Sequence, residues 1–328
     1  MILGLSGAMR RRKFITVLGG AVAWPLAARA QQAGRTYRLG CLFPPPRDNP
    51  PNMAFFDELR RLGFIEGKNL TVEYRAYGQH VDLIPQYVTE LVMARVDVIA
   101  ASGEETVRAM QQATKTIPIV AIVGDMLGSG LVTSLARPDG NTTGVSILAR
   151  ELDGKRQDIL IEAVPGLRRM AVLIDVNYTK FAKLEALQEA ARAHNIELSI
   201  HRIAKGEEIA AAIDSAQASG ALNILSSPLF YARRHLIMDR AAAARLPTIY
   251  QFPEIAEEGG FAAYGPRLSA LNEVTARQVV QLFRGSKVAD IPVEQATKFE
   301  LVINLKTAKG MGVTVPQALL VRADKVIE

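Results

Sequence analysis

The sequence has one cysteine and four histidines among its 328 residues. A single cysteine excludes an internal disulfide framework and any site built from several thiolates. The histidines do not show the spacing of metal ligands: His80, His194, His201 and His235. No G-x-S-x-G motif occurs, and Cys41 has no adjacent base that would make it a nucleophile. We therefore expect no catalytic residue, no metal site and no cofactor, and the protein is predicted not to be an enzyme.

Acidic residues are absent from the first 30 positions, which hold five of the 39 basic residues. Beyond residue 30, the remaining 34 basic residues face 33 acidic ones, so this part of the chain is nearly neutral. It lacks the excess of basic residues that nucleic-acid binding requires, and no nucleic-acid partner is expected. The 49% hydrophobic content excludes a disordered chain, and the length predicts about two domains.

The apolar segment near the N-terminus is too short and too interrupted to span a membrane. It covers residues 14–26, follows a basic cluster at 10–13, and precedes Ala28-Arg29-Ala30. This order is typical of a secretory signal peptide, so residues 1–30 are predicted to be an export signal that is cleaved after Ala30. The mature protein is then expected in the periplasm. The two arginines before Lys13-Phe14-Ile15 also fit a twin-arginine signal, and both export routes and both start codons, Met1 and Met9, stay open.

Short apolar runs alternate with amphipathic ones along the first half of the mature chain. Strands are expected at 37–43, 70–74, 96–101 and 117–123, with helices at 53–62, 81–93 and 104–114 between them. The first of these helices is predicted to begin after Asn52 as its N-cap, because the prolines at 44–46 and 50–51 favour an extended loop. Such alternation predicts a mostly parallel sheet that helices cover on both faces.

The alternation restarts near residue 146. After a helix at 151–163, strands are expected at 170–175, 197–203, 222–225 and 248–251, with helices at 179–193, 206–219 and 230–245. Two arrays of similar size predict an α/β fold with two tandem doubly wound lobes. The first lobe is assigned residues 31–145 and the second 146–264. Each also receives part of 265–328, whose short strands and one helix at 268–283 are expected to cross between the lobes.

Ligands of open α/β sheets bind beyond the carboxyl ends of the strands. Asp175, Asn177 and Tyr178 follow one predicted strand, while Phe230 and Tyr250 stand near the ends of two others. Taken singly, such residues are also typical of turns, caps and cores. As a set, they indicate the lining of a pocket.

Three segments carry a resemblance to a known family. They are residues 134–145 (SLARPDGNTTGV), residues 263–266 (AYGP), and above all residues 293–309 (VEQATKFELVINLKTAK). Together with the exported two-lobe layout, they resemble the substrate-binding proteins of ABC-type, ATP-driven uptake transporters of the tryptophan/tyrosine type. The likeness covers the whole mature chain. It implies a type I periplasmic-binding fold with three interlobe crossings, no catalysis, and delivery of a closed, liganded form to an inner-membrane permease with its ATPase. The protein is expected to act as a monomer.

Carried over by position, the resemblance assigns seven residues to the ligand cleft: Ser102, Asp125, Asp175, Asn177, Tyr178, Phe230 and Tyr250. The sequence departs from the family where Glu104 and Glu105 follow Ser102-Gly103, which disfavours a ligand carboxylate at that helix N-terminus. The predicted function is an exported receptor that clamps a small aromatic or amino-acid-like ligand between its lobes. The alternative is an exported ligand sensor or a periplasmic enzyme on the same fold.

Overall fold

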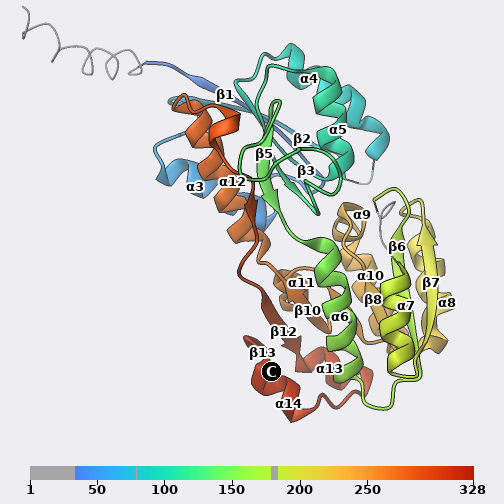
Figure 1. Ribbon diagram of the computed structural model, residues 1–328. Helices are drawn as coiled ribbons and strands as arrows, with labels where there is room; N and C mark the ends of the chain where they lie inside the picture. Colours follow the sequence, from blue (N-terminus) through green and yellow to red (C-terminus); the bar gives the residue numbers. More distant parts are fainter. Residues whose placement is uncertain (1–33, 79, 179–183) are drawn as a thin grey trace, which may run out of the picture.

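The computed structural model describes residues 34–78, 80–178 and 184–328. The predicted export signal and the first residues of the helix predicted at 179–193 lie outside this part of the chain. The described residues form two α/β lobes, one above the other in Figure 1, and each lobe has its own sheet. The predicted fold of two lobes with mainly parallel sheets is confirmed.

The sheet of the first lobe has the strand order β11-β5-β4-β3-β1-β2, and every pairing in it is parallel. Its strands are β1 (Tyr37–Phe43), β2 (Leu70–Ala76), β3 (Val98–Ser102), β4 (Ile119–Val123), β5 (Thr142–Ser146) and β11 (Glu294–Gln295). The helices are α3 (Pro50–Arg61), α4 (Ile84–Met93), α5 (Glu104–Ala113) and α12 (Leu268–Phe283), with 3-10 turns η1 (Val81–Leu83) and η3 (Val288–Asp290).

Both faces of this sheet are covered, which explains its continuous apolar strands. Along β1, Leu39 and Cys41 pack into the core beneath α3 and α12. Leu42, one residue on, belongs to the opposite core beneath α4 and α5. The alternation of side chains along a strand therefore divides a single apolar run between two cores.

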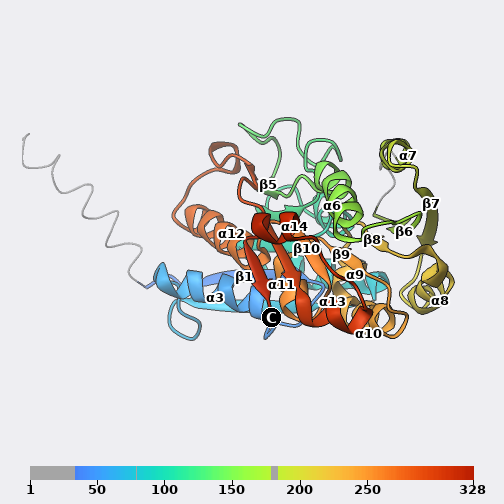
Figure 2. The same cartoon turned by 90° about the horizontal axis from the view of Figure 1, so that it is seen from below.

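The sheet of the second lobe has the order β13-β12-β10-β9-β8-β6-β7. Its pairings are parallel except for the antiparallel pair β10 and β12. The strands are β6 (Arg169–Asp175), β7 (Glu197–Ile203), β8 (Leu222–Ile224), β9 (Thr248–Tyr250), β10 (Ala262–Gly265), β12 (Glu300–Asn304) and β13 (Lys325–Ile327). The C-terminus follows the edge strand β13, at the second lobe in both Figure 1 and Figure 2.

Eight helices and one 3-10 turn surround this sheet in the described part of the chain. They are α6 (Ala149–Ala163), α7 (Leu184–Ala193), α8 (Glu208–Ala216), η2 (Gln217–Ser219), α9 (Pro228–Ala232), α10 (Arg234–Ala243), α11 (Pro253–Glu257), α13 (Leu305–Met311) and α14 (Gln317–Arg322). Three of them, α11, α13 and α14, and the strand β13 are missing from the sequence prediction. These elements have three to seven residues, too few to show a helical or strand period.

The chain passes between the lobes wherever one strand belongs to one sheet and the next strand or helix along the chain belongs to the other lobe. It leaves the first sheet after β5, returns after β10 with α12, which packs against α3, and leaves again between β11 and β12. Residues 147–148, 266–267 and 296–299 make these passages. The cleft between the lobes therefore lies where the carboxyl ends of both parallel sheets face each other.

Several helix bounds differ by a few residues from the sequence prediction, and two of the differences bear on the cleft. Helix α3 begins at Pro50 with Asn49 in the N-cap position, because proline is well accommodated in the first helical turn. Asn52 is therefore inside the helix, and its predicted role as N-cap is wrong. The helix predicted at 230–245 is two helices, α9 and α10, which are separated at Arg233.

Candidate ligand-binding cleft

An inner cavity lies between the two lobes and contains about 560 Å³ of empty space, open solvent included. The first lobe lines it mainly with strand-end residues and one residue of α3: Phe43, Pro44, Pro45, Ser102, Gly124 and Asn52. The second lobe contributes Tyr178, Ser227, Pro228, Tyr231, Gln251 and Phe252. Helix α12 adds Leu268 and Asn272. The walls are therefore mostly aromatic and apolar, with a few neutral polar groups, as is typical of a small-molecule site.

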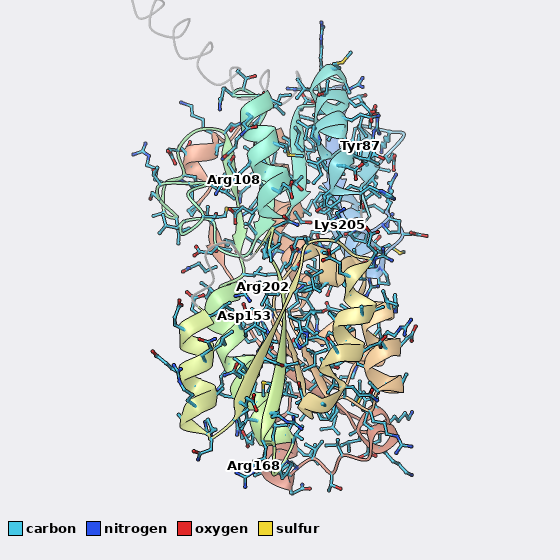
Figure 3. All side chains as sticks on the ribbon, turned by 90° about the vertical axis from the view of Figure 1, so that its right-hand side faces the viewer. Tyr87, Arg108, Asp153, Arg168, Arg202 and Lys205 are labelled. Carbon is cyan, nitrogen blue, oxygen red and sulfur yellow. The ribbon has the colours of Figure 1, made fainter. Side chains whose placement is uncertain are left out.

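A wider outer groove adjoins this cavity and shares Gly103, Tyr178 and Pro228 with it. Charged side chains from both lobes line the groove: Asp82, Glu104, Arg108, Asp175, Lys205 and Arg233. Figure 3 labels Arg108 on the upper lobe and Lys205 near the boundary between the lobes. The cleft thus has a neutral interior and a charged outer part.

The lobes touch at Gly103, which has a φ of +91° between β3 and α5. A Cβ atom built on Gly103 would lie 3.3 Å from the Pro228 Cγ of the second lobe. Both the left-handed backbone and the close approach favour glycine at this position. Ser102, which precedes it, lines the inner cavity, and its carbonyl oxygen accepts a hydrogen bond of 3.5 Å from the Tyr77 hydroxyl.

Tyr178 connects the lobes directly. It follows β6 in the second lobe, and its Oη accepts a hydrogen bond of 3.0 Å from the Gly124 N–H at the end of β4. Burial raises the pKa of Tyr178 above its ordinary value of 10, so the hydroxyl stays protonated at neutral pH.

Tyr231 makes a second contact between the lobes. Its hydroxyl donates a hydrogen bond of 3.2 Å to Asn49 Oδ1, in the N-cap position of α3. The Tyr231 ring meets Phe252 edge to face, with 5.6 Å between ring centroids, and Arg234 stacks over it at 4.7 Å. These contacts fix the aromatic wall of the second lobe.

Asp175 borders the outer groove, but its two oxygens already have partners. Oδ1 accepts a hydrogen bond of 2.9 Å from the Asn177 N–H, and Oδ2 accepts one of 2.6 Å from the Ser227 hydroxyl. Ser227 Oγ in turn caps α9 by accepting from the N–H groups of Leu229 and Phe230. Burial raises the pKa of Asp175, while the Ser227 hydrogen bond acts in the opposite direction. Asp175 therefore joins the end of β6 to the start of α9.

A buried ion pair supports the second-lobe side of the cleft. Arg156 of α6 is 1% exposed and pairs with Asp153 one turn earlier. Its guanidinium also donates to Ser226 Oγ at 2.8 Å and to the Tyr264 carbonyl at 3.1 Å. Burial raises the pKa of Asp153, and Arg156 opposes this effect. The pair ties α6 to the ends of β8 and β10.

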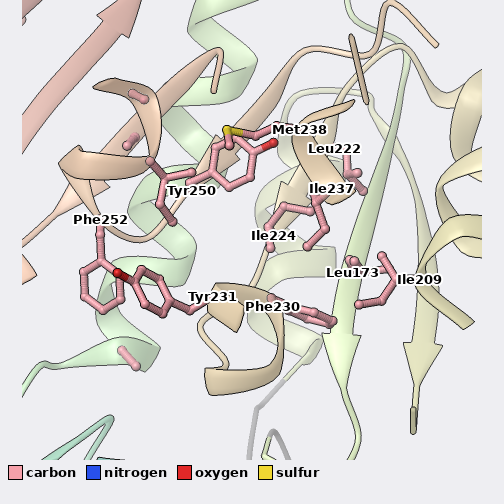
Figure 4. Packing of buried hydrophobic residues seen from close by; sticks show 14 of the residues in the cluster. Leu173, Ile209, Leu222, Ile224, Phe230, Tyr231, Ile237, Met238, Tyr250 and Phe252 are labelled. Carbon is pink, nitrogen blue, oxygen red and sulfur yellow. The ribbon is translucent and has the colours of Figure 1, made fainter. Parts of the chain in front are cut away.

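Two predicted aromatic residues lie elsewhere. Phe230 and Tyr250 are 2% exposed, belong to the apolar core of the second lobe, and line neither the inner cavity nor the outer groove (Figure 4). Their near neighbours Tyr231 and Phe252 line the inner cavity instead. Phe230 and Tyr231 are adjacent on α9, where successive side chains point about 100° apart, whereas Tyr250 ends β9 and Phe252 lies two residues further on. Nothing in the sequence pattern selects the ring that faces the cleft at either place.

Of the other five predicted cleft residues, four line the inner cavity or the outer groove and one lines neither. Ser102 and Tyr178 line the inner cavity, and Asp175, Asn177 and Tyr178 line the outer groove. Asn177 also donates from Nδ2 to the Ala204 carbonyl at 2.9 Å. Asp125 lines neither space and instead accepts a hydrogen bond of 2.8 Å from the Gly128 N–H, which closes a local turn.

Three amide residues of the cavity are missing from the predicted set. Asn52, Gln251 and Asn272 are 4%, 8% and 2% exposed. A signal was present for Asn272, because it is a polar residue on the buried face of the amphipathic helix α12. The sequence pattern predicts a helix cap at Asn52 and gives no sign of a role in the cleft.

Among the described residues, no three histidine, cysteine or acidic side chains are grouped so that they could hold a metal ion. Searching the same residues for a membrane-spanning helix finds none of sufficient length and apolar character.

The fold and the cleft define a two-lobed ligand-binding protein of the type I periplasmic-binding class. Residues 52–327 match the family described as ABC transporter substrate binding protein, and the chain belongs to this family. A tyrosine-binding protein of Clostridioides difficile (strain R20291) is 24% identical over 263 residues, which is 79% of this chain and 75% of that protein.

Two solved structures are similar over 89% of this chain and 100% of their own. One is a conserved domain protein of Vibrio cholerae, with a TM-score of 0.80 and 26% identity. The other is an ABC domain in complex with L-Trp from Streptococcus pneumonia, with a TM-score of 0.79 and 20% identity. The predicted family is confirmed.

Proposed function

We propose that this protein is the periplasmic solute-binding component of an ATP-driven uptake transporter. It closes two lobes, residues 31–145 and 146–264 with their shares of 265–328, on one small aromatic or amino-acid-like molecule. The observation that carries the proposal is the inner cavity, whose walls come from both lobes. A ligand in such a cavity contacts both lobes and stabilises the closed arrangement, which a membrane partner can recognise.

Aromatic side chains support a ligand with a flat part. Phe43 stands on the first-lobe side of the cavity, while Tyr178, Tyr231 and Phe252 stand on the second-lobe side. Ring contacts of this kind add about 0.5 to 1.5 kcal/mol to the burial of apolar area. The tyrosine-binding relative and the L-Trp complex support an aromatic amino acid as the first compound to test.

Ligand binding without turnover is the central test. The purified protein is screened by thermal shift against aromatic and aliphatic acids, amines, amides and amino acids, and the compounds that bind are titrated by calorimetry. A ligand at a hundredfold excess over its Kd should raise the unfolding free energy by about 2.7 kcal/mol. Recovery of the compound unchanged after long incubation fits a receptor, whereas recovery of a product would replace this proposal with the enzyme alternative.

Transport itself needs the membrane partners. Vesicles that contain the inner-membrane permease and its ATPase should hydrolyse ATP faster when the liganded protein is added from the periplasmic side. An unchanged ATPase rate, with a ligand bound at the same time, would favour the sensor alternative. Size-exclusion chromatography with light scattering should give the mass of a monomer.

Export is tested by intact-mass measurement of protein from the periplasm. The mature chain is proposed to begin at Gln31, because small residues occupy the two cleavage positions only there after the apolar run. A periplasmic product that still carries residues 10–30 would contradict the proposed signal. Replacing Arg11 and Arg12 by lysine should trap the precursor if the twin-arginine route is used.

A further inference from the structure

Asn49 occupies the N-cap position of α3 but does not cap this helix. An N-cap side chain normally accepts a hydrogen bond from the backbone N–H of the second or third helical residue. The first two helical residues here are Pro50 and Pro51, which have no N–H, and Asn49 makes no side-chain hydrogen bond to the helix. The carbonyl oxygen of the Asn49 side chain is therefore left for a partner outside α3.

The partner of this oxygen is Tyr231 of the second lobe. Asn49 is 9% exposed, and its Oδ1 accepts the hydrogen bond of 3.2 Å from Tyr231 Oη. Burial raises the pKa of Tyr231 above its ordinary value of 10, so the hydroxyl stays protonated at neutral pH and can donate this bond. The asparagine thus serves the contact between the lobes, and Pro51 removes one donor that would compete for its oxygen.

Tyr231 is held from both sides of the cleft. On the second-lobe side, its ring packs edge to face on Phe252 and beneath Arg234. Arg234 is itself fixed, since its Nη1 donates to the Tyr231 carbonyl at 3.2 Å and its Nε donates to Glu258 at 2.5 Å. Among the described residues, Asn49 is the only hydrogen-bond partner of the Tyr231 hydroxyl. Because the ring lines the inner cavity, the position of this wall relative to the first lobe depends on Asn49.

Asn49 itself lines neither the inner cavity nor the outer groove, so it acts on a ligand only through Tyr231. We infer that Asn49 is a positioning residue, which holds the Tyr231 ring as a wall of the cavity and favours the closed arrangement of the lobes. Both partners of the bond are protein groups, so it favours closure whether or not a ligand is bound. The inference goes beyond the proposed receptor function, and only its effect on affinity rests on that function.

Asn304 provides a matched control within the same chain. It is also an N-cap residue, at α13, but its Oδ1 accepts a hydrogen bond of 3.1 Å from the Thr307 N–H of its own helix. Asn304→Ala should therefore lower the midpoint of thermal unfolding and leave closure unchanged. Asn49→Ala should leave this midpoint nearly unchanged, because α3 loses no cap, and should change closure.

Closure is measured on the mature protein by energy transfer between two dyes, without any ligand. The dyes are attached through Met93→Cys, at the end of α4, and His194→Cys, directly after α7. Both positions are exposed, belong to different lobes and lie on the side of the molecule away from α12 (Figure 1). Cys41 does not compete for the dyes, because it is fully buried and burial raises the pKa of its thiol.

Asn49→Ala and Tyr231→Phe should each move the ratio of closed to open molecules about two- to tenfold toward the open, low-transfer form. The double variant should move it no further than either single variant, because both changes remove the same bond. Asn49→Asp should keep the wild-type ratio, because a carboxylate oxygen also accepts the Tyr231 hydrogen.

Ligand kinetics give a second readout, with L-tyrosine and L-tryptophan as the probes. In Asn49→Ala both compounds should dissociate about two- to tenfold faster in stopped-flow experiments. The factor should be the same for both, because Asn49 lines neither space in which a ligand lies.

The outcomes separate this inference from the proposed function. Unchanged energy transfer in Asn49→Ala, or additive shifts in the double variant, overturns the inference and leaves the receptor in place if either probe binds. A midpoint of unfolding that falls in Asn49→Ala as in Asn304→Ala, or unequal factors for the two probes, overturns the positioning role. The expected shift in energy transfer without binding of either probe supports the inference and counts against the proposed aromatic ligand.

Discussion

The backbone N–H of Gly124, at the end of β4, donates a hydrogen bond of 3.0 Å to Tyr178 Oη, which belongs to the opposite lobe. This bond can form only while the lobes are together, because β4 and β6 belong to different sheets. It therefore contributes to the free energy of closure rather than to the stability of either lobe alone. A neutral hydrogen bond of this kind contributes about 0.5 to 1.5 kcal/mol.

Replacing Gly124 by alanine should weaken ligand binding by roughly tenfold, because closure and binding are coupled. A Cβ atom at this position would lie 2.5 Å from Tyr178 Oη, so the tyrosine must move before the lobes can meet. The midpoint of unfolding of the ligand-free protein should change little. Calorimetric titration with the best aromatic ligand, together with small-angle scattering of the ligand-free form, measures both effects.

Tyr178→Phe provides the rescue control for this prediction. Alone, it loses the hydrogen bond and should weaken binding about two- to tenfold. Combined with Gly124→Ala, it removes the colliding oxygen, and the double variant should bind more tightly than Gly124→Ala alone. Simple addition of the two losses would show that the contact does not form on closure.

Two phenylalanines near the cleft should respond to leucine substitution in opposite ways. Both are buried, but Phe252 lines the inner cavity and Phe230 does not. Phe252→Leu should weaken binding about three- to tenfold by loss of ring contacts, with little change in stability. Phe230→Leu should lower the free energy of unfolding by about 1 kcal/mol and leave the Kd unchanged. Equal losses of affinity in the two variants would show that the cavity wall has been placed on the wrong residues.

The pattern of alternating strands and helices was sufficient to predict the two lobes, because buried parallel strands leave long apolar runs between amphipathic helices. The positions of strand ends also located Ser102 and Tyr178 at the cavity. The choice between adjacent rings depends instead on how a short helix such as α9 is rotated, which tertiary packing decides. Asn52 and Asn272 show a similar limit, since the sequence predicts their helices but not which polar residues of those helices border the cavity.

Asp175 should contribute to stability more than to affinity. Asp175→Ala removes the acceptor for the Ser227 hydroxyl and for the Asn177 N–H, and should lower the free energy of unfolding by about 1 to 3 kcal/mol. Urea unfolding measures this loss, and calorimetry with an amine ligand measures the affinity. A large loss of amine affinity with unchanged stability would instead identify Asp175 as a partner of the ligand cation.

The pH dependence of Asp175 has a defined sign. Burial raises the pKa of its carboxyl above the ordinary value of 3.8, so the folded state binds this proton more readily than the unfolded state. The corresponding stabilisation is present below about pH 4 and is lost as the pH rises through the folded-state pKa. The advantage of the wild type over Asp175→Asn in unfolding free energy should therefore shrink as the pH rises from about 4 through the folded-state pKa. An advantage that grows with pH would mean that the hydrogen bonds outweigh burial.

Glu300 should show the opposite pH dependence. It begins β12, directly after one passage between the lobes, and accepts hydrogen bonds from Arg267 Nε at 3.0 Å and Nη2 at 2.6 Å. Arg267 is the last residue of another passage, just before α12, so the pair joins this passage to the start of β12. The Arg267 guanidinium lowers the pKa of Glu300 below its ordinary value of 4.5.

A lowered pKa means that the stabilisation is present above about pH 4.5 and is lost as the pH falls through the folded-state pKa. Glu300→Gln should therefore lower the free energy of unfolding at pH 7 by about 1 kcal/mol, a modest value because water partly screens the pair. The difference from the wild type should vanish once the pH has fallen below the folded-state pKa. Glu189→Gln, on the exposed face of α7, serves as the control and should change stability little at either pH. A Glu300→Gln deficit that persists unchanged in acid would show that packing, and not the charge of the carboxylate, accounts for its contribution.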